Sequence, residues 1–315
     1  MIEFINVSKA YGQHIAVNNC SFTLKNGEVL GFLGRNGAGK STVMNMLTGY
    51  LPLTCGQILV DGLNIEKNPL EAKKKIGYLP EQPPLYLEMT AREYLAFVCG
   101  IKGIKGKKLV QEETEKNARI TQIADVLDRP IRNLSKGYRQ RVGIAQALTG
   151  SPRYVVLDEP TVGLDPMQIV DIRNLIRDLR KACTVLLSSH ILSEISEVCD
   201  RVIIIHKGII LAEDTVSNLI GQIGRNNKLS VRIRGQEDLL LALLRNIPGV
   251  VSAESLGVQE PGSIDFLVEC QKGSDLRENI ARTLLQADVP LLMLKSLNET
   301  LEDVFMNVIN EKKEV

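Results

Sequence analysis

The sequence lacks any apolar run that approaches the roughly 18 residues needed to cross a bilayer, so we expect no membrane-spanning segment in this chain. Its first residues, MIEFINVSKAYG, lack the basic and then apolar build of a secretory signal peptide. The six cysteines contain no C-x-x-C pair, which argues against a zinc site or a disulfide framework. These absences favour a cytoplasmic protein whose thiols are reduced.

An excess of charge of one sign is also lacking, because 38 Lys and Arg residues against 37 Asp and Glu residues leave a formal net charge of +1. Affinity for nucleic-acid phosphates needs clustered excess Lys and Arg. We therefore expect no nucleic-acid partner. With 315 residues, the chain can hold one large and one small domain, each with its own buried core.

The stretch GRNGAGKST, from Gly34 to Thr42, places three glycines, a lysine and two hydroxyls between two apolar runs. This spacing is the phosphate-binding loop pattern, in which glycines let backbone N–H groups surround a phosphate and a following helix aims its first amides at the same charge. The pattern predicts that Lys40 bridges the β- and γ-phosphates of a nucleotide and that Ser41 offers its hydroxyl to Mg2+. The expected binding residues are Gly34, Arg35, Asn36, Gly37, Ala38, Gly39, Lys40, Ser41 and Thr42.

A second stretch, RYVVLDEP from Arg153 to Pro160, is a short apolar strand that ends in two acids. The carboxyl end of a strand in an open parallel sheet is where such sheets bind ligands. Asp158 is therefore expected to hold Mg2+ through water, and Glu159 to orient or deprotonate the water that attacks a γ-phosphate. Taken alone, the same residues also fit a solvated turn, so the prediction depends on the other motifs.

Three further motifs follow a set order with these two: LSKGYRQR from Leu134, GLDP from Gly163, and LLSSH, which ends at His190. Alone, Ser135 would be a helix N-cap and His190 a strand-end histidine. Together the five motifs resemble those of the ATP-binding subunits of ABC transporters, over about the first 220 residues. In that family they are the phosphate loop, the signature, the acidic strand end, the D-loop and the switch histidine, on an α/β P-loop NTPase core.

The resemblance implies ATP hydrolysis between two such domains that face each other head to tail, with each ATP between one subunit's loop and the other's signature. Ser135 and the amide of Gly137 would then contact the γ-phosphate bound by the second subunit. His190 would hydrogen-bond the γ-phosphate and the attacking water, and Asp165 would fix the two sites relative to each other. Tyr11 is similar to the aromatic residue on which the family stacks adenine, and an exposed tyrosine at a strand edge is nearly as good an interpretation.

The sequence departs from the family pattern at two places. Where the family usually has a glutamine, IGYLPEQPPLY aligns Glu81, with Gln82 next to it, and both interpretations stay open. A carboxylate there could approach Mg2+ directly but would repel the γ-phosphate more than an amide would. In the signature, Lys136 and Tyr138 replace a glycine and a glutamine, and Lys136 adds a positive charge. The expected metal-binding residues are Ser41, Glu81 and Asp158.

The chain is expected to hold an ATP-binding domain over residues 1–222, with a helical subdomain at about 83–150, and an accessory α/β domain over 229–315. The polar stretch GQIGRNNK at 221–228 is the expected linker. The order strand, helix, strand, strand, helix, strand after it indicates a small ferredoxin-like domain. Its end, LNETLEDVFMNVINEK, predicts an amphipathic helix with four apolar residues on one side: Leu301, Val304, Phe305 and Val308.

This tail resembles that of ATPase subunits in one exporter branch, which serves antibiotic efflux, sodium efflux and gliding motility. We therefore expect a subunit that drives a separate integral-membrane permease from the cytoplasmic face of the cell membrane. A homodimer is favoured because all motifs are intact, with a heterodimer as the alternative. An importer ATPase remains an alternative, although helices after residue 236 differ from the all-strand barrels common there. A soluble ABC ATPase fits less well because the chain has one nucleotide domain and no heptad run.

Overall fold

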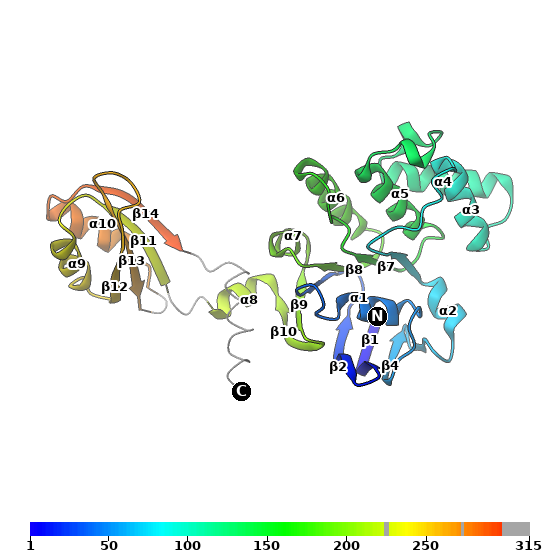
Figure 1. Ribbon diagram of the computed structural model, residues 1–315, viewed down its shortest axis with the longest axis horizontal. Coiled ribbons are helices and arrows are strands. Elements are labelled where there is room, and N and C mark those ends of the chain that lie inside the picture. The colour runs from blue at the N-terminus through cyan, green and yellow to red at the C-terminus, as the bar shows by residue number, and fades with distance from the viewer. Residues whose placement is uncertain (224–226, 272–273, 298–315) are drawn as a thin grey trace. The chain divides into compact units, whose positions relative to one another are not determined.

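The computed structural model describes residues 1–223, 227–271 and 274–297 (Figure 1). The chain divides into two compact units, of which the first runs from Met1 to Val216 and the second begins at Ser217. The predicted amphipathic helix at the tail lies, from residue 298 onward, outside the described residues. Each unit has its own hydrophobic cluster.

The first unit is built on a six-stranded sheet with the order β10-β9-β3-β8-β7-β6. All neighbours pair in parallel except β10 and β9, which form a hairpin. Every residue of β3, β7 and β8 is buried, as expected for parallel strands covered on both faces. The strands are β3 (Val29–Leu33), β6 (Ile76–Leu79), β7 (Tyr154–Asp158), β8 (Thr184–Ser189), β9 (Arg201–His206) and β10 (Ile209–Thr215).

A second, antiparallel sheet of four strands has the order β2-β1-β4-β5. Buried residues of this sheet, of the larger sheet and of helix α1 (Lys40–Leu47) form one hydrophobic cluster, so α1 is held firmly at the end of the glycine-rich loop. Asp61 and Gly62 form a hairpin turn between two strands of this sheet, and both residues have the positive φ that a tight two-residue turn requires. The strands are β1 (Ile2–Tyr11), β2 (His14–Leu24), β4 (Cys55–Val60) and β5 (Leu63–Asn64).

The predicted helical stretch contains three helices (Figure 1). They share a separate cluster of buried apolar residues. The first of them begins with a capping box, in which the Thr90 side chain accepts from the Glu93 N–H while the Glu93 carboxylate accepts from the Thr90 N–H. These helices are α3 (Ala91–Ile101), α4 (Lys107–Ile120) and α5 (Lys136–Leu148), with 3-10 turns at Ala124–Val126 and Ile131–Asn133. The other helices of the first unit are α2 (Pro69–Lys74), α6 (Pro166–Leu179) and α7 (Leu192–Val198).

The second unit has the strand, helix, strand, strand, helix, strand order that the sequence predicts. Its sheet is antiparallel, with the order β12-β13-β11-β14. Buried residues of the sheet and of both helices form one cluster around Val231, Phe266 and Val268. The elements are β11 (Asn227–Ile233), α9 (Glu237–Arg245), β12 (Val250–Gly257), β13 (Ile264–Cys270), α10 (Arg277–Gln286) and β14 (Leu291–Leu297).

The predicted linker at 221–228 is too long. Helix α8 runs from Val216 to Ile223, and β11 begins at Asn227. The apolar residues of α8 recur at helical spacing in the sequence, so the helix continues through the glycine at 221. The glycine and polar residues suggested a linker from residue 221, but the apolar helical spacing before and after this glycine was the better guide.

Cysteine burial leads to a labelling prediction. Cys55 is the exposed thiol among the six, whereas burial raises the pKa of Cys183 to about 11 and that of Cys20 to about 12. Because the thiolate is the nucleophile, thiols with raised pKa values stay protonated and unreactive near pH 8. We expect iodoacetamide at pH 8 to label the native chain at Cys55 alone, measured by mass spectrometry. The pKa is raised by burial at the other three as well: Cys99, Cys199 and Cys270.

The Cys55→Ser variant is the control. It is expected to remain unlabelled when native and to take up five labels, one on each remaining cysteine, after denaturation. Rapid labelling of this variant in its native state would contradict the burial described.

Candidate functional site

The glycine-rich loop connects β3 to α1, as its pattern predicts. Gly39 is the N-cap of α1 and has φ 106°, and a Cβ at this position would lie 2.7 Å from the Ala16 carbonyl oxygen. Gly37 has φ 79° and open space around it. A side chain at Gly39 would therefore be strained and would clash, whereas glycine leaves the loop free to wrap around a ligand. The N-terminus of α1 adds unpaired amides at the same place.

Lys40, the first residue of α1, turns back beneath the loop. Its side chain is 6% exposed, and its Nζ donates to the carbonyl oxygens of Gly34, at 2.7 Å, and Arg35, at 3.4 Å. The same Nζ lies 3.0 Å from Oε1 of Glu159. Lys40 is thus a buried cation whose one carboxylate contact in the described part of the chain is the acid at the end of β7.

Both acids at the end of β7 are held by one serine of the neighbouring strand. The Ser188 hydroxyl donates to Oδ1 of Asp158 at 2.5 Å and accepts from the N–H of Glu159 at 2.9 Å. Asp158 is 2% exposed and Glu159 is 5% exposed. Glu159 has φ 49°, a left-handed conformation that is uncommon for a residue other than glycine and that gathers at functional sites.

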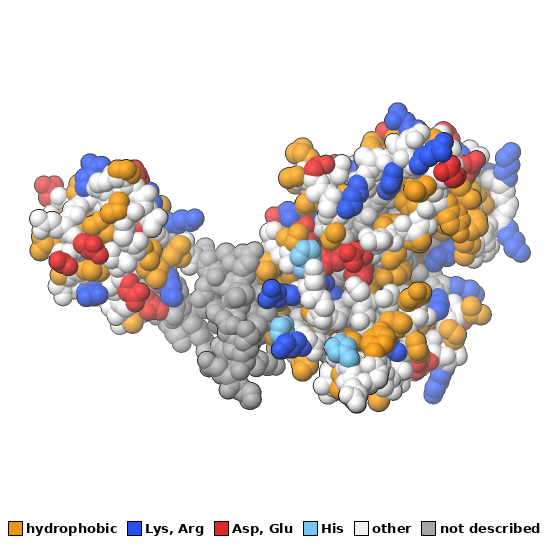
Figure 2. All heavy atoms as spheres, viewed as in Figure 1, with side chains coloured by type: hydrophobic (Ala, Val, Ile, Leu, Met, Phe, Trp, Pro, Cys, Tyr) orange, Lys and Arg blue, Asp and Glu red, His pale blue; other side chains and the backbone are white. Residues whose placement is uncertain are grey.

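His190 follows β8 directly, and its Nδ1 lies 2.8 Å from Oε2 of Glu159. Glu159 therefore contacts Lys40 through one oxygen and His190 through the other. No hydrogen-bond partner besides the lysine ion pair is found for Oε1 in the described residues. Figure 2 shows acidic side chains gathered in the middle of this face of the first unit, with a histidine beside them.

A cavity of 510 Å³ brings most of the predicted residues together. Tyr11, 47% exposed, stands at its edge. Sequence reasoning missed His14, Ala16 and Val162, which line it too and carry no motif signal. The predicted residues in its lining are Tyr11, Asn36, Gly37, Ala38, Gly39, Lys40, Ser41, Thr42, Glu81, Glu159 and His190.

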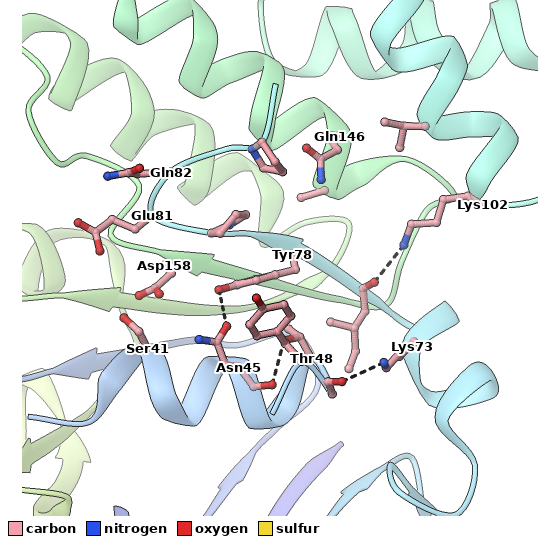
Figure 3. A pocket seen from close by; sticks show the side chains of 17 residues that line it. Ser41, Asn45, Thr48, Lys73, Tyr78, Glu81, Gln82, Lys102, Gln146 and Asp158 are labelled. Atoms are coloured by element: carbon pink, nitrogen blue, oxygen red, sulfur yellow. Dashed lines mark hydrogen bonds between the residues drawn. The ribbon is translucent and has the colours of Figure 1, made fainter. Parts of the chain in front are cut away.

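An adjoining groove of 770 Å³ contains the three predicted metal-binding residues, and Figure 3 shows Asp158 between Ser41 and Glu81. Glu81 lines both the groove and the 510 Å³ cavity, whereas Gln82 lines only the groove of these two. Burial and then the charges of Asp158 and Glu81 raise the pKa of Tyr78, whose hydroxyl donates to Asn45 at 3.1 Å. The negative potential at this place suits a cation.

The hydroxyl and carboxylate oxygens of Ser41, Glu81 and Asp158 suit Mg2+ better than a metal ion whose ligands all come from the protein. Among the described residues, no group of three or more His, Cys, Asp and Glu side chains could hold a metal ion. Mg2+ usually keeps several waters and takes one or two carboxylates together with substrate phosphates. A hydroxyl and two carboxylates beside a phosphate loop are therefore a sufficient set.

Six predicted residues are not in the lining of the 510 Å³ cavity: Gly34, Arg35, Ser135, Gly137, Asp158 and Asp165. Asp158 lines the adjoining groove instead, and the carbonyl oxygens of Gly34 and Arg35 accept from Lys40. Ser135 is the N-cap of α5, where its side chain accepts from the Tyr138 N–H at 3.3 Å. Asp165 is the N-cap of α6, and Pro166 is the first helical residue. Within one chain, the signature and the D-loop are therefore not part of the cavity that the phosphate loop lines.

A strand–glycine loop–helix unit, a buried lysine beneath the loop and an acidic strand end facing it define the chain as a P-loop ATPase. The family model described as ABC transporter matches residues 17–162. Bacitracin transport ATP-binding protein BcrA of Bacillus licheniformis is 41% identical over 215 residues, which cover 68% of this chain and 69% of that protein. The chain belongs to the ATP-binding proteins of ABC transporters, a family that binds and hydrolyses ATP.

Two other comparisons extend this likeness. Linearmycin resistance ATP-binding protein LnrL of Bacillus subtilis is 34% identical over 254 residues, covering 79% of this chain and 80% of that protein. A dimeric ATP-binding cassette, solved in a post-hydrolysis state with ADP and phosphate, has a TM-score of 0.62 at 26% identity. The structural match covers 68% of this chain and 98% of the cassette. No helix in the described residues is both long enough and apolar enough to cross a membrane.

Proposed function

We propose that this ATPase forms a head-to-tail dimer around two ATP molecules and drives a separate integral-membrane permease that exports its substrate. The observation that carries the catalytic part is the position of Glu159. This buried carboxylate lies between Lys40 and His190 at a cavity lined by the phosphate loop. An acid in this position can take the proton of a water that attacks the γ-phosphate.

Binding of ATP would replace the ion pair between Lys40 and Glu159. Phosphate oxygens of ATP compete with Glu159 for the Lys40 ammonium, because both are anionic acceptors. Once Lys40 has moved to the β- and γ-phosphates, Glu159 loses its cation and becomes a better proton acceptor. The water oxygen then bonds to the γ-phosphorus, its proton passes to Glu159, and the bond to the bridging oxygen of ADP breaks. His190 donates to the γ-phosphate and holds the water beside Glu159.

Ser41, Asp158 and Glu81 would hold Mg2+, which neutralises charge on the phosphates when bound. We assign the third position to Glu81 because it lines both the cavity and the groove. Tyr11 at the cavity edge is available to stack on adenine.

A second copy of the chain completes the site in this proposal. Ser135 and Gly137 lie at the start of α5 and outside the cavity of their own chain, so they are available to a γ-phosphate held by the other subunit. Asp165 begins α6 and would contact the opposite site. The dimeric cassette among the solved relatives supports a dimer of this kind, and intact motifs favour a homodimer.

The 770 Å³ groove, with the loop from Glu81 to Leu87 beside it, is the proposed docking place for the permease. The chain would then be peripheral at the cytoplasmic face of the cell membrane. Export is favoured because the named relatives are a bacitracin transport protein and a linearmycin resistance protein. An antibiotic-like cargo is the corresponding expectation for the permease.

The test of the transport assignment uses tagged Glu159→Gln, locked with ATP and recovered from detergent-solubilised native membranes, with bound proteins identified by mass spectrometry. We expect a multi-spanning permease without a substrate-binding protein. Lys40→Ala, treated identically, is the control that cannot form the ATP-locked dimer. A substrate-binding protein recovered with the permease would favour import instead. Ribosomal or DNA-bound material without any membrane protein would overturn the transport role.

A further inference from the structure

Helix α7 contains a buried acid that the steps above do not use. Glu194 is 3% exposed, and none of the cations in the described residues forms an ion pair with it. Its Oε2 accepts two hydrogen bonds from neutral hydroxyls, and its Oε1 has no hydrogen-bond partner in the described part of the chain. Burying a carboxylate with so few donors is costly, so its presence calls for a structural reason.

The two hydroxyls come from the segments that carry the proposed catalytic pair. Thr161 Oγ1, two residues after Glu159, donates to Glu194 Oε2 at 2.6 Å. Ser189 Oγ, immediately before His190, donates to the same oxygen at 2.9 Å. One carboxylate oxygen thus joins the end of β7 to the end of β8.

Ser189 also ties the start of α7 to this point, because its Oγ accepts from the N–H of Ile191 at 3.0 Å. His190 is therefore flanked by Ser189 and Ile191, which are joined by a hydrogen bond to the Ser189 hydroxyl. Its ring can meet Glu159 at 2.8 Å only while these two segments keep their spacing. Glu194 is not among the residues that line the 510 Å³ cavity, so it acts without touching the nucleotide.

We propose that Glu194 is a positioning residue for ATP hydrolysis, which holds the Glu159 segment and the His190 segment at hydrogen-bonding distance from each other. The inference rests on the proposed roles of Glu159 and His190. A carboxyl oxygen suits this task because its two lone pairs can accept from both hydroxyls at once. An error of about 1 Å in such a pair can cost on the order of 100-fold in rate.

The experiment compares steady-state ATP hydrolysis by the full chain and its variants. Glu194→Ala removes the shared acceptor, and Thr161→Val removes one donor while keeping the shape of the side chain. Both are expected to lower kcat, Glu194→Ala by on the order of 10- to 100-fold, with little change in KM for ATP. Glu194→Gln keeps an oxygen acceptor and is expected to recover most of the lost kcat.

Glu197→Ala is the matched control on the same helix, because the Glu197 side chain is 52% exposed and its carboxylate pairs with Arg173, at 2.9 Å, and not with Thr161 or Ser189. It is expected to keep the kcat of the unchanged chain. Thermal unfolding of each variant, followed by circular dichroism, shows whether a lower kcat results from a smaller folded fraction. If Glu194→Ala does not fold, the kcat of Thr161→Val still tests the positioning role.

A kcat for Glu194→Ala or Thr161→Val equal to that of Glu197→Ala would overturn the positioning role. So would a loss that appears mainly as a raised KM. Glu159→Gln, assayed in parallel, separates this failure from that of the proposed catalytic step. Near-normal hydrolysis by Glu159→Gln would refute the proposed base, whereas an inactive Glu159→Gln beside a fully active Glu194→Ala would refute only the positioning role.

Discussion

Glu159→Gln is expected to hydrolyse ATP about 1000-fold more slowly than the unchanged chain, because it removes the proposed general base. It is also expected to bind ATP more tightly. Lys40 is 3.0 Å from the Glu159 carboxylate, and ATP has to displace that contact to reach the lysine. An amide holds a cation less strongly than a carboxylate does, so the competition weakens. Single-turnover hydrolysis and titration with ATP measure the two effects separately.

Glu71→Gln is a suitable control, since Glu71 is an exposed acid that pairs with Lys74 on the surface of α2. It is expected to change neither quantity. Hydrolysis by Glu159→Gln at the rate of this control would leave the mechanism without its base. Unchanged ATP affinity would mean that the Lys40–Glu159 pair does not oppose nucleotide binding.

Lys40→Ala is expected to weaken ATP binding by on the order of 100-fold, because a charge-assisted contact to the phosphates is lost. A second effect appears without any nucleotide. Both members of the Lys40–Glu159 pair have side chains that are 6% exposed, so removing the lysine leaves a buried carboxylate without its cation. Breaking such a pair on one side lowers the free energy of unfolding by about 3 kcal/mol.

The double variant Lys40→Ala, Glu159→Gln separates the two effects. It lacks the unpaired charge, so its free energy of unfolding is expected to recover part of the loss while its ATP affinity stays low. Urea unfolding and ATP titration on both variants provide the measurement. If the single and double variants have equal stability, then the unpaired Glu159 carboxylate is not what destabilises Lys40→Ala. Unimpaired ATP binding by Lys40→Ala would contradict the assignment of the loop.

Local signals in the sequence were sufficient for the elements that carry the site. The glycine spacing before Lys40, the N-cap at Asp165 and the capping box at Thr90 depend on residues within one turn of each other, and the structure has each of them. The apolar strand before Asp158 ends where the sequence predicts. Such patterns are short-range, so one sequence is enough to recognise them.

Contacts between distant segments could not be predicted in the same way. The ion pair of Lys40 with Glu159 and the hydrogen bonds of Ser188 and Glu194 depend on which strands are neighbours, and sheet order has no local signal. The two serines before His190 were the available hint, but serine is ordinary at a strand end. The roles of Ser135 and Gly137 need a second subunit and so stay predictions.

The place of β3 within its sheet has a consequence for biosynthesis. β3 precedes the phosphate loop, yet its two neighbours are β8 and β9, whose residues are paired with it from Val185 and Arg201 onward. Long-range parallel pairing of this kind forms slowly, and a chain emerging from the ribosome makes it only after the later strands have been synthesised. A nascent chain that has just completed its glycine-rich loop therefore contains every residue of that loop and no place to hold ATP. The nucleotide can act as a folding ligand only after Ile204, the last residue of β9 that pairs with β3, has emerged.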